Sequence, residues 1–588
     1  MRRLPLRLTT SLPIALALTA GASAQNNISW LTMHEDNTKV PAGSLGATDP
    51  LEKDYDWGDL DQDGYTDLVV ARKVGWTGGG PAPNVLMMNE AGTLVDRTAL
   101  YASASDVPGD QGFLEHTNDR DIEIVDVDGD GWLDVVTCTA ITLNLPKHLS
   151  HPRVYMNLGL DGSANWLGLE YQDARFPDLG NTPFFCGVGS GDVTGDGSPE
   201  LYFAHYIAAG AFGQDDRLMI NDGAGNFTDE TFSRLTAPML SSGFGTSAYI
   251  VDMNNDGVND VLRDFSGPTT IAYNDPNNEG FFDILQTAYN GAAYHVNHGD
   301  LNQDGLQDMI FSDDATDTYL INQGNDALGR VIWSTDNFFA ADGGFAGNNL
   351  IVDMNGDGWN EALVTDVDVD ISGCFGRMFI HHNRGGVPGG IPSMWEEVGS
   401  GFTGITGILS SDLSGSHDVA VFDLDNDGDM DMILGRCNTT DVWINDSTSG
   451  QANNYCGPAV LNSNATSAKM GYTGSLDASL NAFSLVATDM PTNQFGFFLI
   501  SATQGSAFPA SVSQGKLCLG GTIARFNAQI VNSGATGSFT VPIDTTMLPN
   551  PLSQPILAGQ TWNFTAWFRD NNPTPTSNFT DGIEILFH

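Results

Sequence analysis

Basic residues are scarce in this sequence of 588 residues. Lys and Arg together number 23 against 73 Asp and Glu, so the formal net charge is -50. Non-specific nucleic-acid binding and attraction to an anionic membrane surface both depend on clustered cations. The composition therefore argues against nucleic acid and anionic membranes as partners. It also argues against a disordered acidic tail, because 41% of the residues are hydrophobic and only 16% are charged.

Long apolar runs are lacking as well, and no stretch approaches the roughly 18 residues of a membrane-spanning helix. The first 24 residues begin with Met-Arg-Arg, continue with a short apolar run over residues 12–19, and end in Ala-Ser-Ala before Gln25. This pattern is typical of a secretory signal peptide, and a buried N-terminal helix is the alternative. We expect residues 1–24 to be removed near Ala24-Gln25 and the mature protein to be secreted or held at the cell surface.

Cysteine is rare. None of the six cysteines forms a C-x-x-C pair, so the sequence predicts neither a zinc ribbon nor a thioredoxin-like site. Cys456 and Cys518 both fall in the C-terminal region. They either form a disulfide or remain as two buried thiols, and the sequence leaves both open.

Glycine, in contrast, is abundant at 68 residues, which points to many turns. One nine-residue pattern, D-x-[DN]-x-D-G-x-x-[DE], recurs along the chain. Six copies begin at Asp59, Asp126, Asp252, Asp300, Asp353 and Asp423. A seventh copy begins at Asp192 and is degenerate, because Thr194 occupies its third position. The first and last copies begin 364 residues apart, which is six intervals of about 61 residues. A fixed period of this length indicates a repeat architecture.

The spacing within each copy suits a calcium ion. Side chains at positions 1, 3 and 5 of a tight turn converge on one point, the glycine at position 6 permits the bend, and the acid at position 9 closes the shell. Position 7 offers its backbone carbonyl. Ca²⁺ accepts six to eight such oxygens, whereas Mg²⁺ keeps its waters and resists an all-protein cage. We therefore predict up to seven bound Ca²⁺ ions, with the third site weakened by Thr194.

The candidate metal ligands are the residues at positions 1, 3, 5, 7 and 9 of the seven loops. They are Asp59, Asp61, Asp63, Tyr65, Asp67, Asp126, Asp128, Asp130, Trp132, Asp134, Asp192, Thr194, Asp196, Ser198, Glu200, Asp252, Asn254, Asp256, Val258, Asp260, Asp300, Asn302, Asp304, Leu306, Asp308, Asp353, Asn355, Asp357, Trp359, Glu361, Asp423, Asp425, Asp427, Asp429 and Asp431.

Strands rather than helices flank these loops. An EF-hand needs a Glu at position 12, where these loops carry residues such as Val70, Thr137 or Leu434. Each loop is followed by a short apolar run, then by a second apolar segment that ends in Asn and a polar turn. Most repeats add a further strand, which makes about four strands per repeat. Four-stranded units repeated radially are the blades of a β-propeller.

The ends of the repeat region predict how the ring closes. The last repeat has no outer strand after Asn445, whereas an orphan apolar segment over residues 28–33 precedes the first repeat. We expect this segment to supply the outer strand of the last blade, so that no sheet edge is exposed.

The loops, with Gly243-Phe244-Gly245 ahead of the fourth, resemble the FG-GAP/VCBS repeats of integrin-α-type propellers over roughly residues 28–450. The resemblance implies an all-β fold with a seven-bladed calcium-binding propeller over residues 25–450. Propellers of this kind serve as adhesion heads, as glycan-binding modules and as polysaccharide-active enzymes, so the resemblance leaves the function open.

The sequence pattern changes at about residue 450. Residues 451–588 have no acidic loops and carry about seven strand-like runs, which predicts a β-sandwich. The segment resembles a C-terminal module of other large secreted bacterial repeat proteins. Attachment at the cell surface and a passive stabilising role both remain open for it.

The sequence assigns no catalytic residue. Ser416-His417-Asp418 are consecutive, and neighbours on a strand point to opposite faces, so they do not form a catalytic triad. Trp132 and Trp359 either pack between repeats or stack on sugars. Longer insertions over residues 72–83, 139–152, 205–215 and 366–377 leave from equivalent positions and should gather on one rim.

Three functional hypotheses follow. The first is a secreted, calcium-stabilised binding or adhesion module for a glycan or protein. The second is a polysaccharide-active enzyme, a lyase or hydrolase, on the propeller rim. The third is a structural component of the cell envelope.

Overall fold

The structure is a computed structural model that describes residues 30–587 with internal gaps. The residues within this span that it does not describe are 42–50, 74–81, 141–144, 181–182, 207–214, 241–244, 265–266, 292, 314–315, 340–346, 368–375, 397–403, 438, 447–451, 475, 477, 479–480, 482, 509–512, 558–559 and 573. The predicted signal peptide, residues 28–29 of the orphan segment, Gly243-Phe244 and much of the four rim insertions lie outside the described residues.

The fold is all-β, as predicted. Residues 31–445 form seven sheets of four or five strands, numbered here 1 to 7 in chain order. Sheet 1 contains β2 (Glu52–Gly58), β3 (Asp67–Lys73), β4 (Val85–Asn89) and β5 (Leu94–Asp96). Sheet 2 contains β7 (Asp119–Val125), β8 (Asp134–Thr139), β9 (Arg153–Asn157), β10 (Leu169–Tyr171) and β6 (Ala104–Ser105). Sheet 3 contains β11 (Phe185–Gly191), β12 (Glu200–His205), β13 (Arg217–Asn221) and β14 (Phe227–Asp229). Sheet 4 contains β15 (Ala248–Val251), β16 (Asp260–Arg263), β17 (Thr269–Asn274) and β18 (Phe282–Tyr289).

The remaining sheets repeat this order. Sheet 5 contains β19 (Ala293–Gly299), β20 (Asp308–Asp313), β21 (Thr318–Leu320) and β24 (Asn337–Phe338), with a hairpin of β22 (Asn322–Asn325) and β23 (Val331–Trp333) beside it. Sheet 6 contains β25 (Asn349–Val352), β26 (Glu361–Thr365), β27 (Met378–Asn383) and β28 (Met394–Glu396). Sheet 7 contains β30 (Ser416–Phe422), β31 (Asp431–Arg436), β32 (Thr439–Asn445), β1 (Leu31–Glu35) and β29 (Ile405–Thr406).

Short helices lie between some of these strands: α1 (Thr98–Tyr101), α2 (Lys147–Ser150), α3 (Thr231–Arg234), η1 (Asn37–Lys39), η2 (Gly112–Leu114), η3 (Asp173–Arg175) and η4 (Ala237–Leu240). Each has only three or four residues. Within the described part of the chain, no helix is long or apolar enough to cross a membrane.

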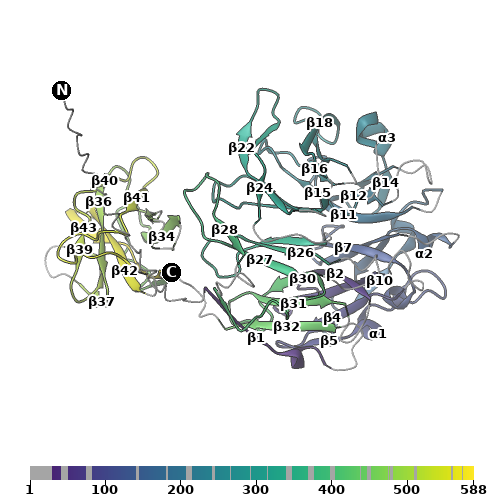
Figure 1. Cartoon of the computed structure of the whole chain (residues 1–588), viewed down its shortest axis with the longest axis horizontal. Coiled ribbons are helices and arrows are strands. Elements are labelled where there is room, and N and C mark those ends of the chain that lie inside the picture. The colour runs from purple at the N-terminus through teal and green to yellow at the C-terminus, as the bar shows by residue number, and fades with distance from the viewer. Residues whose placement is uncertain are drawn as a thin grey trace, which may run out of the picture.

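The first strands of the seven sheets contact one another in sequence order, and β2, β7, β11 and β15 can be followed in Figure 1. β2 contacts β7, β7 contacts β11, and β11 contacts β15. The Val296 amide of β19 donates to Ser247 Oγ, next to β15, at 3.2 Å. β19 contacts β25, β25 contacts β30, and β30 contacts β2, so the series returns to its start.

The core is divided among the spaces between neighbouring sheets. One buried cluster joins Val69 of sheet 1 to Val135 of sheet 2, and the same arrangement continues from sheet to sheet. The last cluster joins Ile433 of sheet 7 to Val85 of sheet 1. Each sheet therefore buries both faces, because each one packs between two others.

Glycines allow two first strands to approach closely. A Cβ at Gly189 of β11 would lie 2.4 Å from the Ala248 carbonyl oxygen of β15. Real Cβ atoms do not come that close to a backbone oxygen, so the contact between sheets 3 and 4 requires glycine at this position.

The start of the chain joins its end in sheet 7. β1 pairs antiparallel with β32, with Met33 opposite Asn445 and Glu35 opposite Trp443. β1 covers residues 31–35 and so contains residues 31–33 of the orphan segment, whose residues 28–29 lie outside the described residues.

Residues 452–586 form separate sheets from the first seven. They contain β33 (Ala452–Tyr455), β34 (Lys469–Gly474), β35 (Phe483–Thr488), β36 (Phe495–Ser501), β37 (Gln504–Ala507), β38 (Leu517–Leu519), β39 (Ala524–Arg525), β40 (Val531–Asn532), β41 (Phe539–Ile543), β42 (Thr561–Asn571), β43 (Pro575–Phe579) and β44 (Gly582–Leu586). A seven-stranded sheet around β36 and β42 shares one core with the three-stranded sheet β34-β35-β41.

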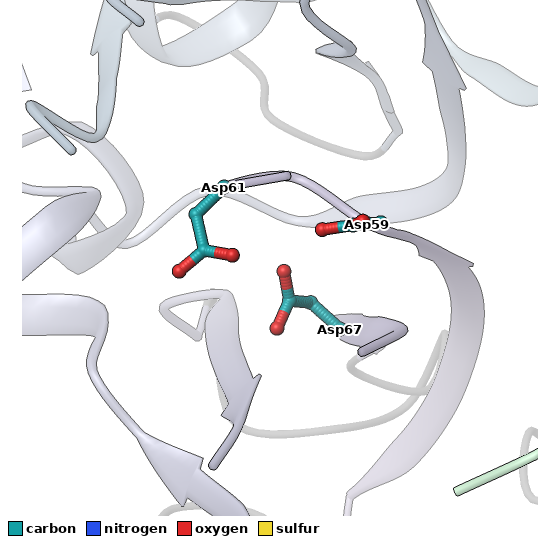
Figure 2. A group of neighbouring side chains, drawn as sticks. All are labelled: Asp59, Asp61 and Asp67. Carbon is teal, nitrogen blue, oxygen red and sulfur yellow. The ribbon is translucent and has the colours of Figure 1, made fainter. Parts of the chain in front are cut away.

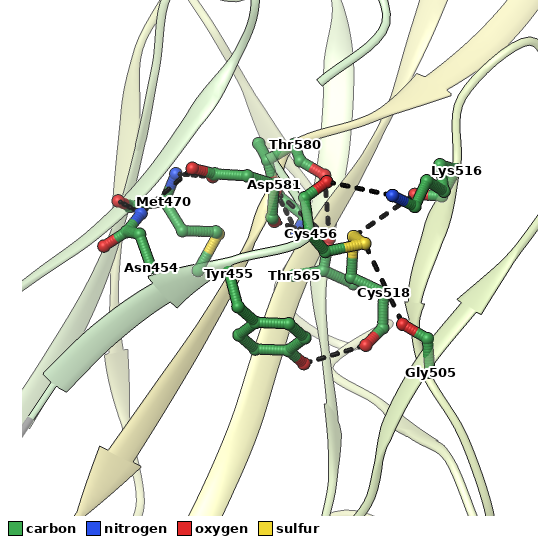
Figure 3. The surroundings of a disulfide bond; sticks show 11 residues. Asn454, Tyr455, Cys456, Met470, Gly505, Lys516, Cys518, Thr565, Thr580 and Asp581 are labelled. Atoms are coloured by element: carbon green, nitrogen blue, oxygen red, sulfur yellow. Dashed lines mark hydrogen bonds between the residues drawn. A yellow bond between two sulfur atoms is a disulfide. The ribbon is translucent and has the colours of Figure 1, made fainter. Parts of the chain in front are cut away.

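A disulfide joins Cys456 and Cys518 across this C-terminal part (Figure 3). Nearby, the Tyr455 hydroxyl donates to the Cys518 carbonyl at 2.8 Å. Cys437 of the seventh repeat is also disulfide-bonded. Cys138 and Cys186 are both buried, and Cys186 Sγ accepts a hydrogen bond from Arg120 Nε at 3.3 Å.

Candidate metal centre

The seven acidic loops occupy the same place in the seven sheets. Each loop connects the first strand of a sheet to the second, and the second strand begins at the position 9 acid. In sheet 1, β2 ends at Gly58, Asp59 takes position 1, and β3 begins at Asp67. The sequence pattern therefore coincides with a structural unit in every repeat.

The position 1 carboxylate organises each turn. In all seven loops it accepts a hydrogen bond from the amide of the position 6 glycine at 2.7–3.0 Å, as Asp59 does from Gly64. In the first loop, Gly64 has a φ of +92°, and Gln62, two residues earlier, has a φ of +58°. A glycine at position 6 adopts such a left-handed backbone at little cost.

Carboxylates gather inside the loops with Asp at position 3. Oxygen atoms of Asp59, Asp61 and Asp67 all lie within 4.8 Å of one another (Figure 2). Two more groups meet the same description, Asp126–Asp128–Asp134 and Asp423–Asp425–Asp431. Several hard oxygen atoms at this separation are the donor set that a divalent cation such as Ca²⁺ prefers, so these clusters could hold a metal ion.

The position 9 acid also anchors its loop. One of its oxygens accepts the amide of position 2 at 2.8–3.2 Å in all seven loops. In six loops the other oxygen accepts the amide of the asparagine that follows the apolar third segment, as Asp67 does from Asn89 at 2.8 Å. Each carboxylate oxygen has a further lone pair for a metal.

Burial raises the pKa of these carboxyl groups. The pKa rises to about 8 for Asp67, Asp260 and Asp308. It rises to about 7 for Asp134, Glu200 and Asp431. Desolvation is the main cause in each case, and neighbouring loop carboxylates add to it. A bound cation would stabilise the ionised forms in place of a proton.

Seven asparagines tie each loop to the loop before it. The side-chain Nδ2 donates to the backbone carbonyl at position 2 of the preceding loop, at 2.7–3.3 Å. The pairs are Asn157 to Leu60, Asn221 to Val127, Asn274 to Val193, Asn322 to Met253, Asn383 to Leu301, Asn445 to Met354 and Asn89 to Leu424. The last pair links sheet 1 to sheet 7, so the hydrogen bonds form a closed series.

Residues 192–263, from the third loop to the end of β16, match the family model of the FG-GAP-like repeat. These residues therefore form an FG-GAP-like repeat, and the match together with the all-β sheets supports an FG-GAP repeat protein of the β-propeller type. No curated protein matches the chain.

The third loop, which begins the FG-GAP-like repeat, differs from the others in the hydrogen bonds at two ligand positions. Thr194 Oγ1 and Glu200 Oε1 are both buried without a hydrogen-bond partner. Glu200 Oε2 accepts the amides of Val193 and Thr194. The Glu279 carboxylate of the next sheet lies against Gly195 and leaves no room there for a Cβ. The third loop thus presents two buried oxygens but lacks the three-carboxylate cluster found in the first, second and seventh loops among the described residues.

The two tryptophans at position 7 differ in their surroundings. Trp132 is half-buried, whereas Trp359 of the sixth loop is only 1% exposed. Trp359 is thus placed for packing rather than for stacking on a sugar in solution. Ser416, His417 and Asp418 are buried at the start of β30, where Asp418 Oδ2 accepts the Tyr55 amide at 2.7 Å.

A polar cavity lies where the seven first strands meet. Its volume is about 190 Å³, and side chains or backbone from all seven sheets line it. Carboxylates that line the cavity form hydrogen bonds between neighbouring first strands. Asp56 accepts the Ile124 amide at 2.7 Å, and Asp121 accepts the Val188 amide at 2.8 Å. No local sequence pattern marks these residues, so they are absent from the predicted sites.

Two acids of this cavity are strongly perturbed. Burial, together with the charge of Glu123, raises the pKa of Asp56 well above its usual range. Burial raises the pKa of Glu123 to about 7. Trp57, Tyr249 and Asn297 also line the cavity, so it offers aromatic surface beside hydrogen-bonding groups.

Proposed function

We propose that this protein is a secreted, calcium-stabilised seven-bladed β-propeller with a C-terminal β-sandwich, and that it binds an extracellular glycan or protein. The cavity at the meeting point of the seven first strands carries the binding role. Several carboxylates and amides can accept or donate hydrogen bonds to hydroxyl groups there, and aromatic rings can cover the apolar face of a sugar. This chemistry favours a glycan over a protein.

The closed series of contacts supports seven blades. The first strands, the shared cores and the asparagine hydrogen bonds all lead from sheet 7 back to sheet 1. A ring of this kind hides the edges of its sheets from solvent. The common core of the two C-terminal sheets supports the sandwich.

The chemistry of the loops supports calcium. Only oxygen donors are present at the ligand positions, and the carboxylates are already gathered by backbone hydrogen bonds. In each loop, positions 1, 3, 5 and 9 would hold the ion with side-chain oxygens and position 7 with its carbonyl. The ion would supply charge neutralisation and rigidity.

Export is supported by the disulfides. The Cys456–Cys518 bond and the bonded state of Cys437 are typical of an oxidising compartment. We propose that the first 24 residues direct the chain there, to an extracellular or cell-surface location.

A glycan array probed with the full chain in Ca²⁺ tests the binding role. We expect selective binding to one glycan class, and a Tyr249→Phe variant that loses the hydroxyl at the cavity should bind that class roughly three- to tenfold more weakly. Tyr101→Phe, which alters a ring packed on Trp166 away from the cavity, is the matched control. Unchanged affinity in Tyr249→Phe, or no binding to any glycan, would contradict the proposed site.

A polysaccharide-active enzyme is the second candidate. It is favoured by Asp56 and Glu123, two carboxyl groups with raised pKa in one cavity, because a group titrating near pH 7 can act as a general acid. Product release from polysaccharides that is lost in Glu123→Gln would favour the enzyme. Binding without turnover would favour the binding module.

A further inference from the structure

The sixth acidic loop, residues 353–361, is covered where the other six are open. Asp357 at position 5 is 6% exposed. Its counterparts are all exposed to solvent: Asp63, Asp130, Asp196, Asp256, Asp304 and Asp427. Asn355 and Trp359 of the same loop are buried as well.

A tyrosine of the C-terminal part lies over this loop. The Tyr472 hydroxyl donates to the Asp357 backbone carbonyl at 2.6 Å, across 115 residues of sequence. Tyr472 belongs to β34, which lies on the side of the C-terminal part that faces the first seven sheets (Figure 1). Its ring packs against the C-terminal core, with the Phe483 ring centroid 6.1 Å away.

Covering this loop has an electrostatic cost. Asp353, Asp357 and Glu361 lie in one turn, where Asp357 is 6% exposed and Glu361 is fully buried. Ionised carboxylates are expensive to remove from water unless a cation neutralises them. An ion in the loop would reduce this cost and hold the Asp357 carbonyl in place for Tyr472.

We propose that Tyr472 latches the C-terminal part onto the sixth loop, and that a Ca²⁺ ion in this loop and the docked position of the C-terminal part stabilise each other. The inference rests on the proposed calcium binding by the loops. Coupling between two equilibria is reciprocal. Docking of the C-terminal part must therefore raise the Ca²⁺ affinity of the sixth loop by the same factor by which Ca²⁺ raises the docking equilibrium constant. The other six loops have no such coupling, because their position 5 acids are open to solvent.

Tyr472→Phe in the full chain tests the latch. It keeps the ring on the C-terminal core and removes one hydrogen bond. Hydrogen exchange of peptides covering 353–361, followed against Ca²⁺ concentration, should show a roughly three- to tenfold weaker apparent Ca²⁺ affinity for the sixth loop alone. Peptides covering 300–308 are the internal reference. Tyr455→Phe is the matched control, because its hydroxyl donates within the C-terminal part.

Small-angle scattering tests the effect of Ca²⁺ on the docking of the C-terminal part. In Ca²⁺ the wild type should be compact, and the radius of gyration should increase in EGTA as the C-terminal part is released. Asp357→Asn should show this increase even in Ca²⁺, whereas Asp304→Asn, the same change in the open fifth loop, should not. Identical sixth-loop affinity in Tyr472→Phe and wild type, or the same radius of gyration in Ca²⁺ and EGTA, would overturn the coupling while leaving calcium binding intact. Absence of any calorimetric Ca²⁺ binding would overturn both proposals.

Discussion

At the scale of single residues, the asparagines that end the third segments have a role that their spacing alone did not reveal. Asn274 Nδ2 donates to the Val193 carbonyl at 2.8 Å and to the Asn259 carbonyl at 3.0 Å. One side chain thereby holds two loops of neighbouring sheets.

Asn274→Asp should destabilise the fold, because the carboxylate cannot donate to these two buried carbonyls. Leaving buried acceptors unpaired costs about 1–3 kcal/mol. Thermal unfolding in saturating Ca²⁺ would measure the loss. Asn277→Asp, in the exposed turn that follows, is the control and should leave the melting temperature unchanged. Equal melting temperatures for the two variants would contradict the bridging role.

The buried Asp264 carboxyl predicts that stability falls as the pH rises. Burial raises its pKa to about 7, although Thr246 and Ser247 donate to it. Because the folded pKa lies above the unfolded value of about 3.9, its contribution to stability is lost as the pH rises from about 4 to 7. Asp264→Asn should therefore be more stable than wild type above pH 7, by about 1.4 kcal/mol for each unit of pKa shift removed, and similar near pH 4.

Melting temperatures of Asp264→Asn and wild type across pH 4–8 would measure this effect. Asp283→Asn removes a charge from an exposed position of β18 and serves as the control. A difference between Asp264→Asn and wild type that does not grow with pH would show that the Asp264 carboxyl is not penalised in the folded state.

At the scale of strands and loops, the first strands are held by close backbone approach as well as by side chains. Gly187, Gly189 and Gly191 alternate along β11 and all lie against β15 or the residue before it. This face of β11 has no side chains, so the two strands come nearer than ordinary packing allows.

Gly189→Ala should push β11 away from β15. Overpacking of this kind typically costs about 1–3 kcal/mol. Urea unfolding would show a lower midpoint, and glycan binding at the central cavity should weaken with it. Gly162→Ala, which has open space around its Cβ, is the control. An unchanged midpoint for Gly189→Ala would mean that the strands are not tightly apposed.

The C-terminal part depends on its disulfide. The Cys456–Cys518 bond closes a loop with a sequence separation of 62 residues. The chain-entropy model assigns about 4 kcal/mol to such a loop. Replacing both cysteines by serine should lower the unfolding temperature of residues 452–587 and leave sheets 1 to 5 unchanged, which hydrogen exchange can resolve. Equal loss of protection in both parts would contradict this separation.

At the scale of the whole molecule, stability should depend on divalent cations. The seven loops lie at the same place in a closed series of sheets, so each ion would brace the junction to a neighbouring loop. A site filled at ten times its Kd adds about 1.4 kcal/mol. EGTA should therefore lower the melting temperature by an amount that reflects several sites, and excess Ca²⁺ should restore it whereas Mg²⁺ should not. A melting temperature that is unaffected by EGTA would contradict the proposed calcium role.

Much of this organisation could be predicted from local sequence. The loop pattern located the turn between first and second strands in every sheet, because ligand spacing and glycine turns act within nine residues. The all-β class and the FG-GAP resemblance followed from the same repeats. The register of β1 against β32 needed the structure, because the orphan segment carries no local signal of its partner residues.

The sequence by itself determined where each loop lies, which oxygens it gathers and how the strands alternate, because these depend on short-range geometry. Only the tertiary structure decided what crosses between repeats. Asn89 donates to the Leu424 carbonyl, Asp56 accepts the Ile124 amide, and Tyr472 donates to the Asp357 carbonyl. Each of these hydrogen bonds joins residues far apart in the sequence. Such pairs carry no local signal, because their partners become neighbours only when the sheets pack against one another.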